Sequence, residues 1–392
     1  MPINVAPTMK RAILIGSAAA LLLATATAIW LARKVDDLPP ELENRLQLRD
    51  LPANRWVKYH EEKPGTWRCQ GHAGMAFDSK RGSLLIFGSD THGEDWDNAV
   101  HEFQPHLKRW LTHYPPAGPE TYRTDEAGRP VAGTGTVLPW AMHTYDAIEY
   151  HPGLPALVIT STPGHNPKGK SVPGITQQPT WIYDLSTRRW SALPNNGKPS
   201  PTFFGGSSAY DARRDALIAY RGAIWELDTA AGEWHRAAGG HHELHHTMVY
   251  APPRGTAFVF GDYRPTTAIW SYRPGAAIGG AGSWEKLEPS GDRCPPYDIA
   301  PVAYDALQDL FVLVVDNEDA SSSPPKKATS ASTYLYDPAA NAYTKLPSAD
   351  LPAVGMNFMM AWNSTDEVVF LVTGGYEGLV TVWAMRPAHP GP

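Results

Sequence analysis

Histidine is the residue type in this sequence most suited to chemistry. The chain has fifteen histidines among 392 residues, and eight of them lie in short polar segments between apolar runs. These eight are His72, His92, His143, His165, His241, His242, His245 and His246. Arg221 and Arg264 lie in segments of the same kind. Imidazoles and guanidiniums that converge on one surface suit proton transfer, metal binding or recognition of an anion.

Residues 242–246 match a known metal-binding pattern. They read HELHH, which fits H-E-x-x-H, where two histidines on one helical face bind zinc and the glutamate activates water. Two glycines, at 239 and 240, precede this segment with only His241 between, and an apolar run, 247–250, follows it. The sequence therefore leaves no room for a helix of two or three turns and argues against a metalloprotease. The cofactor prediction is a divalent metal held by a loop, with His242 and His246 as ligands.

The elements that position these residues repeat along the chain. An apolar run that ends in an aromatic residue and a polar turn recurs six times. The aromatic residues are Phe77, Tyr150, Tyr210, Tyr250, Tyr304 and Trp362. A strongly apolar run follows each turn, at 84–88, 156–160, 216–220, 257–261, 310–315 and 368–374. Two such runs in succession predict the paired strands of a hairpin.

Most copies continue with a third strand and then, seven residues after an aromatic or leucine, an aromatic residue that opens a fourth. The pairs with this spacing are Phe103 and Trp110, Tyr183 and Trp190, Leu227 and Trp234, and Tyr336 and Tyr343. In a further copy a Gly-rich insertion, 274–282, lengthens the interval between Tyr272 and Trp284. Four-stranded units of this kind cannot bury their faces alone, so the sequence predicts an all-β ring of stacked sheets.

The last copy ends without a fourth strand of its own. Near the start of the chain, RWVKY at 55–59 resembles the fourth-strand openings at 189–193 and 283–287. We expect this N-terminal strand to complete the last sheet and close the ring, which removes the free sheet edges. The tryptophans at this repeated position are expected to be packing residues.

Two segments connect the repeat to a known family. Residues 85–92, LIFGSDTH, are followed by Asn-x-Val-x-x-Phe at 98–103 and by Trp110. The next copy opens with His143-Thr144-Tyr145-Asp146. Over residues 55–386 the chain resembles bacterial kelch-like β-propellers of the galactose-oxidase central-domain type. The number of repeated motifs predicts six blades, or seven if the long segment 115–139 hides another sheet. The resemblance implies no single function, because such propellers include oxidases, polysaccharide lyases, isomerases and interaction modules.

In such propellers one face is formed by the loops that enter each first strand and by those between the second and third strands. The entry loops would carry His72, His143, His242, His245 and His246. The other loops would carry His92, Trp96, Arg221, Tyr263 and Arg264. Histidines at these positions can also simply hydrogen-bond the neighbouring blade. We therefore expect a binding or scaffold module that holds a protein partner in the cell envelope.

The alternative function is that of a polysaccharide lyase acting on acidic glycans. β-Elimination next to a uronate carboxylate needs a group that neutralises the carboxylate, a base and an acid. Arg221 or Arg264 would meet the carboxylate, His143 or His92 would be the base, and Tyr263 the acid. His72, Trp96, Arg264 and His245 would bind the ligand.

An uncharged segment near the N-terminus predicts a membrane anchor. Residues 12–32 would span roughly 32 Å as a helix, enough for the hydrocarbon core of a bilayer. We expect residues 1–11 in the cytoplasm, 12–32 in the inner membrane, 33–54 as a linker, 55–386 as the propeller in the periplasm, and 387–392 as a tail. The alternative is a secreted protein, because Ala24-Thr25-Ala26 resembles a signal cleavage site.

Composition excludes other classes of function. The formal net charge is −6 and no basic stripe occurs, which argues against a nucleic-acid partner. The two cysteines, Cys69 and Cys294, cannot form a disulfide framework. Neither has a compelling tyrosine partner in the sequence for the crosslink that a copper-radical oxidase needs.

Overall fold

The computed structural model describes residues 39–65, 67, 71–193, 201, 203–317, 328–347, 351–374 and 378–389. The predicted membrane segment, 12–32, and Cys69 lie outside these ranges. Within them, no helix has the length and apolar character needed to cross a membrane. The described chain is all-β apart from helix α2 (Pro40–Arg49) and the short 3-10 helices η1 (Thr91–Gly93), η2 (Pro105–Leu107), η3 (Pro119–Thr121) and η4 (Pro167–Lys170).

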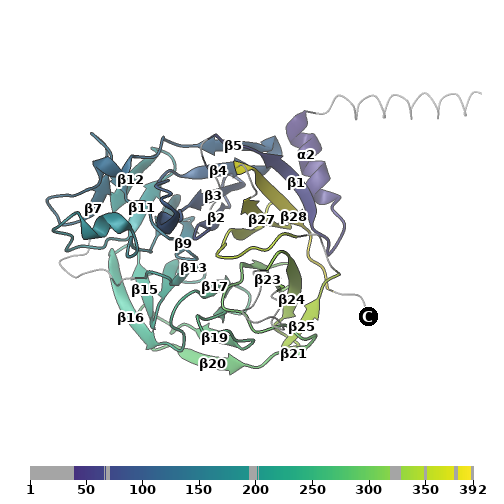
Figure 1. The fold of residues 1–392 in the computed structure, drawn as a ribbon. Coiled ribbons are helices and arrows are strands. Elements are labelled where there is room, and N and C mark those ends of the chain that lie inside the picture. The colour runs from purple at the N-terminus through teal and green to yellow at the C-terminus, as the bar shows by residue number, and fades with distance from the viewer. Residues whose placement is uncertain are drawn as a thin grey trace, which may run out of the picture.

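Sheets of mostly four antiparallel strands follow one another around a ring (Figure 1). The first sheet contains β2 (Gly74–Asp78), β3 (Ser83–Phe87), β4 (His101–Gln104) and β5 (Arg109–Thr112). The second contains β9 (Ile148–His151), β10 (Ala156–Ile159), β11 (Trp181–Asp184) and β12 (Arg189–Ala192). The third contains β13 (Ser207–Asp211), β14 (Ala216–Tyr220), β15 (Ala223–Asp228) and β16 (Glu233–Gly239).

Three further sheets complete the ring. The fourth contains β17 (Thr247–Ala251), β18 (Thr256–Phe260), β19 (Ile269–Arg273) and β20 (Ser283–Leu287). The fifth contains β22 (Val302–Asp305), β23 (Leu310–Asp316), β24 (Ala331–Asp337) and β25 (Ala342–Lys345), with β21 (Ser290–Gly291) parallel to β25. The sixth contains β26 (Met360–Asn363), β27 (Val368–Gly374), β28 (Val380–Met385) and β1 (Val57–Glu62).

The first strands of these sheets contact one another in a closed cycle. β2 contacts β9, β9 contacts β13, and the series continues through β17, β22 and β26 back to β2. The fold is therefore propeller-like. A small sheet of β6 (Arg123–Thr124), β7 (Pro130–Ala132) and β8 (Leu138–Pro139) occupies the long segment 115–139 and pairs only within itself.

The predicted closure by the N-terminal strand is observed. β1 pairs antiparallel with β28, from Val57 opposite Ala384 to Glu62 opposite Val380. Just before β1, the indole Nε1 of Trp56 donates a hydrogen bond of 2.8 Å to Thr333 Oγ1 in the neighbouring sheet. Residues from the start and the end of the described chain thus share one sheet.

The hydrophobic core lies between adjacent sheets. One cluster combines Leu85 and Phe87 of the first sheet with Leu157 and Trp181 of the second. The repeated tryptophans Trp56, Trp110, Trp190, Trp234 and Trp284 all lie in or against such clusters, which confirms that they are packing residues. Stacking of one sheet on the next therefore stabilises the ring, as a repeat architecture requires.

The segment 33–54, expected to be a linker, contains helix α2. Leu48 of this helix is fully buried in the core cluster that also holds β1 residues. Asn44 Nδ2 donates a hydrogen bond of 2.8 Å to the carbonyl of His106, and Lys108 Nζ donates one of 2.6 Å to Gln47 Oε1. The helix is therefore docked on the outer side of the ring, beside β1 (Figure 1).

Candidate functional site

Five histidines from three sheets gather on one face of the ring, and we call them the histidine cluster. His72, His143 and His245 come from the loops before β2, β9 and β17, whereas His92 lies in η1 and His165 lies between β10 and β11. The rings of His72 and His143 stack with centroids 4.1 Å apart. The ring of His92 lies 4.6 Å from that of His143 and 5.3 Å from that of His165.

His245 joins the cluster through Tyr145, whose ring lies 5.3 Å from the His245 ring and 5.5 Å from the His72 ring. The structure thus brings together His72, His92, His143 and His245, which the sequence had placed in two different sets of loops.

His143 is the most enclosed member of the cluster. Its side chain is buried, with Nε2 3.1 Å from Thr91 Oγ1 and Nδ1 3.0 Å from Tyr145 Oη. Burial, followed by the neighbouring imidazoles His72 and His92, lowers the pKa of His143 to about 2. The ring is therefore neutral at pH 7.

Arg221 supplies a guanidinium beside the cluster. Its Nη1 donates a hydrogen bond to the carbonyl of Phe204, and the guanidinium lies 5.9 Å from the centre of the Phe204 ring. Burial lowers the pKa of His245 to about 4, and Arg221 contributes to the same shift. A neutral imidazole and a cation therefore lie near each other on this face.

Two histidines of the cluster, and the Tyr145 that contacts them, have left-handed backbone conformations although none is glycine. The φ angles are 70° at His72, 50° at Tyr145 and 64° at His245. Each of these residues stands two or three positions before a first strand, and in the third sheet the corresponding residue is Gly205, with φ of 67°. A side chain in this conformation costs roughly 1–2 kcal/mol relative to glycine. Strain of this kind concentrates at functional sites.

Asp90 provides a carboxylate next to two imidazoles. His72, Asp90 and His143 each offer one ligand atom, and these atoms all lie within 4.8 Å of one another. Among the described residues, this is the group of three histidine, cysteine or carboxylate side chains close enough together to bind one metal ion.

The predicted metal ligands His242 and His246 lie outside that group. Tyr220 Oη accepts hydrogen bonds from the backbone N–H groups of His241 and His242, at 2.7 and 2.8 Å. The hydroxyl can then donate to His242 Nδ1, at 2.9 Å, which leaves the ring proton of His242 on Nε2. A protonated Nε2 has no lone pair for a metal, so this arrangement does not favour His242 as a ligand.

His246 is also buried, and its Nδ1 lies 2.8 Å from Ser207 Oγ. Burial holds its pKa well below the ordinary histidine value. The Nε2 atoms of both His242 and His246 have no hydrogen-bond partner among the described residues.

The predicted acid Tyr263 and the predicted ligand-binding residues Arg264 and Trp96 are spread more widely. Tyr263 is 56% exposed, and its ring lies 5.9 Å from that of His245. Arg264 is exposed and lies 3.3 Å from Glu243 Oε1. Trp96 packs edge-on against Tyr122 in the apolar cluster under the small sheet, so it is part of a core rather than a free aromatic surface.

Tyr145 and Asp90 are site residues that the sequence did not single out, and Tyr145 is the one with a detectable signal. Tyr145 lies within the His-Thr-Tyr segment that carries the family resemblance, two residues after His143. The periodic position directly before a first strand, which it shares with His72 and His245, was the signal that could have identified it.

Comparisons with known proteins extend only to a distant structural likeness. No protein-family model and no curated protein matches the chain. Among solved structures, the chain is similar to a fungal alcohol oxidase of the AA5 family, described in complex with copper. The identity is 14%, the TM-score is 0.48, and the match covers 85% of this chain and 77% of that one. A likeness of this degree carries no argument about activity.

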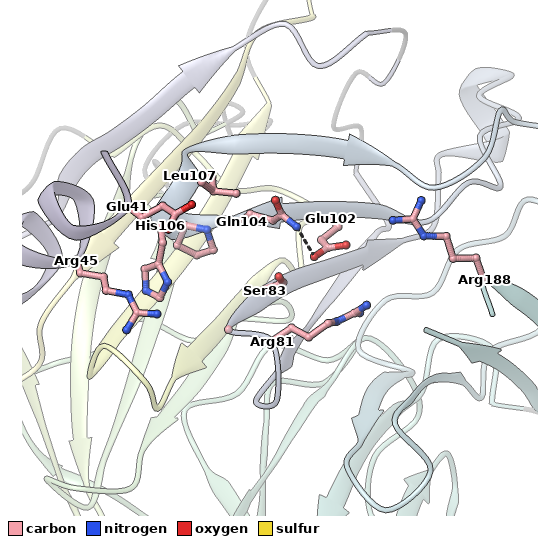
Figure 2. Close-up of a pocket in the computed structure, with 11 residues that line it drawn as sticks. Glu41, Arg45, Arg81, Ser83, Glu102, Gln104, His106, Leu107 and Arg188 are labelled. Atoms are coloured by element: carbon pink, nitrogen blue, oxygen red, sulfur yellow. Dashed lines mark hydrogen bonds between the residues drawn. The ribbon is translucent and has the colours of Figure 1, made fainter. Parts of the chain in front are cut away.

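A separate pocket of about 270 Å³ lies between α2 and the first sheet (Figure 2). Its lining includes Arg45, Arg81, Glu102 and Arg188. The Glu102 carboxylate accepts hydrogen bonds from Gln104 Nε2 at 3.1 Å and His113 Nε2 at 2.7 Å, and Arg81 Nε donates to Asp78 at 2.5 Å. The buried charge in this pocket is already paired, which indicates a structural role.

Proposed function

We propose that the chain is a six-bladed propeller that acts on acidic glycans by β-elimination at the histidine cluster. In this reaction a base removes the proton next to a uronate carboxylate, and an acid protonates the leaving oxygen as the C–O bond breaks. A cation must also stabilise the charge that develops on the carboxylate.

Three side chains can take these roles. Arg221 would hold the uronate carboxylate, His245 would accept the proton, and the exposed Tyr263 beside it would donate a proton to the leaving oxygen. We assign the base to His245 because both ring nitrogens of His143 already have hydrogen-bond partners. The pKa of His245, lowered to about 4 by burial, keeps its imidazole unprotonated at neutral pH.

The observation that carries this proposal is the composition of the cluster together with its backbone strain. Imidazole, phenol and guanidinium groups dominate it, whereas a glycoside hydrolase generally needs a pair of carboxyl groups across the bond. Left-handed residues that are not glycine place His72, Tyr145 and His245 there, at a position where Gly205 serves the third sheet without strain.

The test is an assay for unsaturated products. The full chain would be incubated with a panel of uronate-containing polysaccharides, and absorbance of the new C=C bond would be followed. We expect activity on at least one of them and a loss of roughly 100-fold or more in His245→Ala and Arg221→Ala.

The matched control is His241→Ala, which removes an exposed imidazole that stacks on Trp270 with centroids 3.8 Å apart, outside the cluster. Its activity should be unchanged. Absence of activity on every acidic glycan, or full activity in both site variants, would refute this function.

A scaffold role in the cell envelope is the second candidate. The docking of α2 favours it, because this helix would hold the ring close to an anchor formed by residues 12–32 in the inner membrane. A phosphatase that works only after export, fused at Pro392, should be active if the ring lies in the periplasm. A stoichiometric protein partner that co-purifies from detergent-solubilised membranes, without lyase activity, would support the scaffold instead.

A further inference from the structure

The donor atoms of His72, Asp90 and His143 lie within 4.8 Å of one another, slightly farther apart than the ligands of a bound metal ion. Zinc binds nitrogen and oxygen at about 2.0–2.2 Å, so ligand atoms around a tetrahedral ion lie roughly 3.3–3.6 Å apart. His72 Nδ1 lies 3.5 Å from Asp90 Oδ1, and His143 Nε2 lies 3.8 Å from the same oxygen. Small side-chain rotations would bring all three atoms within bonding distance of one ion.

One ring nitrogen of His72 is buried without a hydrogen bond. Its Nδ1 is buried and has no hydrogen-bond partner among the described residues, although Asp90 stands beyond hydrogen-bond distance on the same side. A buried polar atom without a partner costs about 1–3 kcal/mol. A bound cation at this point would remove that cost.

Hydrogen bonds from other residues orient two of the three proposed ligands, Asp90 and His143. Asp90 Oδ1 accepts hydrogen bonds from the backbone N–H groups of His92 at 3.2 Å and Gly93 at 3.4 Å. Nδ1 of His143 lies 3.0 Å from the Tyr145 hydroxyl, which orients the ring so that Nε2 faces Asp90. Binding of an ion would replace the contact of 3.1 Å that Nε2 makes with Thr91 Oγ1. Orientation of a ligating imidazole through its other ring nitrogen is typical of metal sites.

We propose that His72, Asp90 and His143 bind one divalent transition-metal ion, of which zinc is the best fit. Two imidazoles and one carboxylate match the preferences of zinc and its neighbours, whereas calcium and magnesium prefer oxygen ligands throughout. The ring of His92 lies 4.6 Å from that of His143, but His92 is not part of the group of three ligand residues, so the proposed site leaves a coordination position open. The ion site is distinct from the roles given above to Arg221, His245 and Tyr263.

The experiment measures metal binding without any substrate. The full chain, purified with a tag that contains no histidine and stripped with EDTA, would be titrated with zinc chloride by calorimetry. We expect one zinc per chain, with affinity weakened by about 100-fold or more in His72→Ala and in Asp90→Asn. His241→Ala should bind zinc like the unchanged protein.

Cobalt provides a second readout. Co²⁺ in place of zinc should give the visible absorption of a four- or five-coordinate nitrogen and oxygen site, and Asp90→Asn should change that spectrum. Near-ultraviolet circular dichroism would establish that each variant is folded. Asp90→Asn keeps the shape of the side chain, so it serves if His72→Ala does not fold.

Failure to bind zinc, or unchanged binding in both folded variants, would overturn the metal site. Those outcomes differ from failure of the proposed activity. Lyase activity in a chain that binds no zinc would refute only the metal site, and stoichiometric zinc without lyase activity would refute only the catalytic proposal.

Discussion

The buried carboxylate of Glu102 shows how strongly neighbouring hydrogen-bond donors can shift a pKa in this fold. Glu102 in β4 would be costly to bury as an ion, yet His113 Nε2 contacts it at 2.7 Å, and Tyr183 Oη lies 3.0 Å from the other ring nitrogen of His113. Burial acts to raise the pKa of Glu102, but hydrogen bonds from His113, Ser83 and Gln104 outweigh it and lower the pKa to about 2. The ionised form therefore stabilises the folded state.

The pH dependence follows from that direction. A lowered folded-state pKa adds stability above the unfolded value, near 4.5, and this stability is lost as the pH falls from there through about 2. We expect the difference in unfolding free energy between the unchanged protein and Glu102→Gln to be on the order of 3 kcal/mol at pH 7 and to shrink toward pH 2. Urea unfolding at a series of pH values measures it.

Glu126→Gln is the control, since it alters an exposed carboxyl in a turn and should leave the pH profile as it was. A constant difference between Glu102→Gln and the unchanged protein from pH 7 to pH 2 would contradict the argument.

At the scale of the element, most of the hairpins are built around the same turn. An aspartate or asparagine at the strand end accepts backbone hydrogen bonds from two and three residues ahead, as Asp184 Oδ1 does from Ser186 and Thr187, both at 2.8 Å. Four residues after the aspartate the backbone is left-handed. In the turn that begins at Asp228 this residue is Gly232, with φ of 68°. In the turn that begins at Asp184 it is Arg188, with φ of 54°. Such turns connect neighbouring strands whatever the sequence of the strands themselves.

This turn predicts a stabilising substitution. Arg188→Gly should stabilise the protein by about 0.5–1 kcal/mol, because the relief of left-handed strain exceeds the added entropy of the unfolded chain. Thermal or urea unfolding would measure the change.

Arg189→Gly is the matched control, one residue later in β12. There the backbone is extended and glycine should destabilise by about 0.5–1 kcal/mol. A loss of stability in Arg188→Gly as large as that in Arg189→Gly would contradict this account of the turn.

At the scale of the whole molecule, stability depends on closure of the ring. The sixth sheet takes one strand from residues 57–62 and three from the end of the chain. Without β1, the backbone groups of β28 would form an exposed edge, and the Trp56 contact to the fifth sheet would be lost. Each sheet is supported by its neighbours, so an opening at one point weakens the whole cycle.

Deletion of residues 51–62 should therefore abolish cooperative thermal unfolding and promote aggregation. A synthetic peptide of residues 51–62, added to the truncated chain, should restore the transition. Deletion of residues 39–49 is the comparison, because α2 lies outside the ring and its loss should lower the melting temperature while the transition stays cooperative. A truncated chain that melts like the intact protein would show that β1 is not needed for closure.

Much of the architecture was predictable because its signals are local. The alternation of apolar runs with aspartate turns predicts hairpins, and the seven-residue spacing of aromatic residues predicts the third and fourth strands. The missing last strand, together with the pattern around Trp56, indicated the closure seen between β1 and β28. Helix α2 was not predicted, since its only fully buried side chain is Leu48 and its sequence carries little apolar periodicity.

The sequence by itself determined that the chain forms repeated β-sheets and which loops are rich in histidine. Only the tertiary structure decided that His72, His92, His143, His165 and His245 meet, that Tyr145 and Asp90 join them, and that His242 and His246 turn inward against Tyr220 and Ser207. The physical reason is that residues far apart in the chain come together only when the sheets close into a ring. Their mutual distances then depend on how each sheet stacks on the next, which no local pattern encodes.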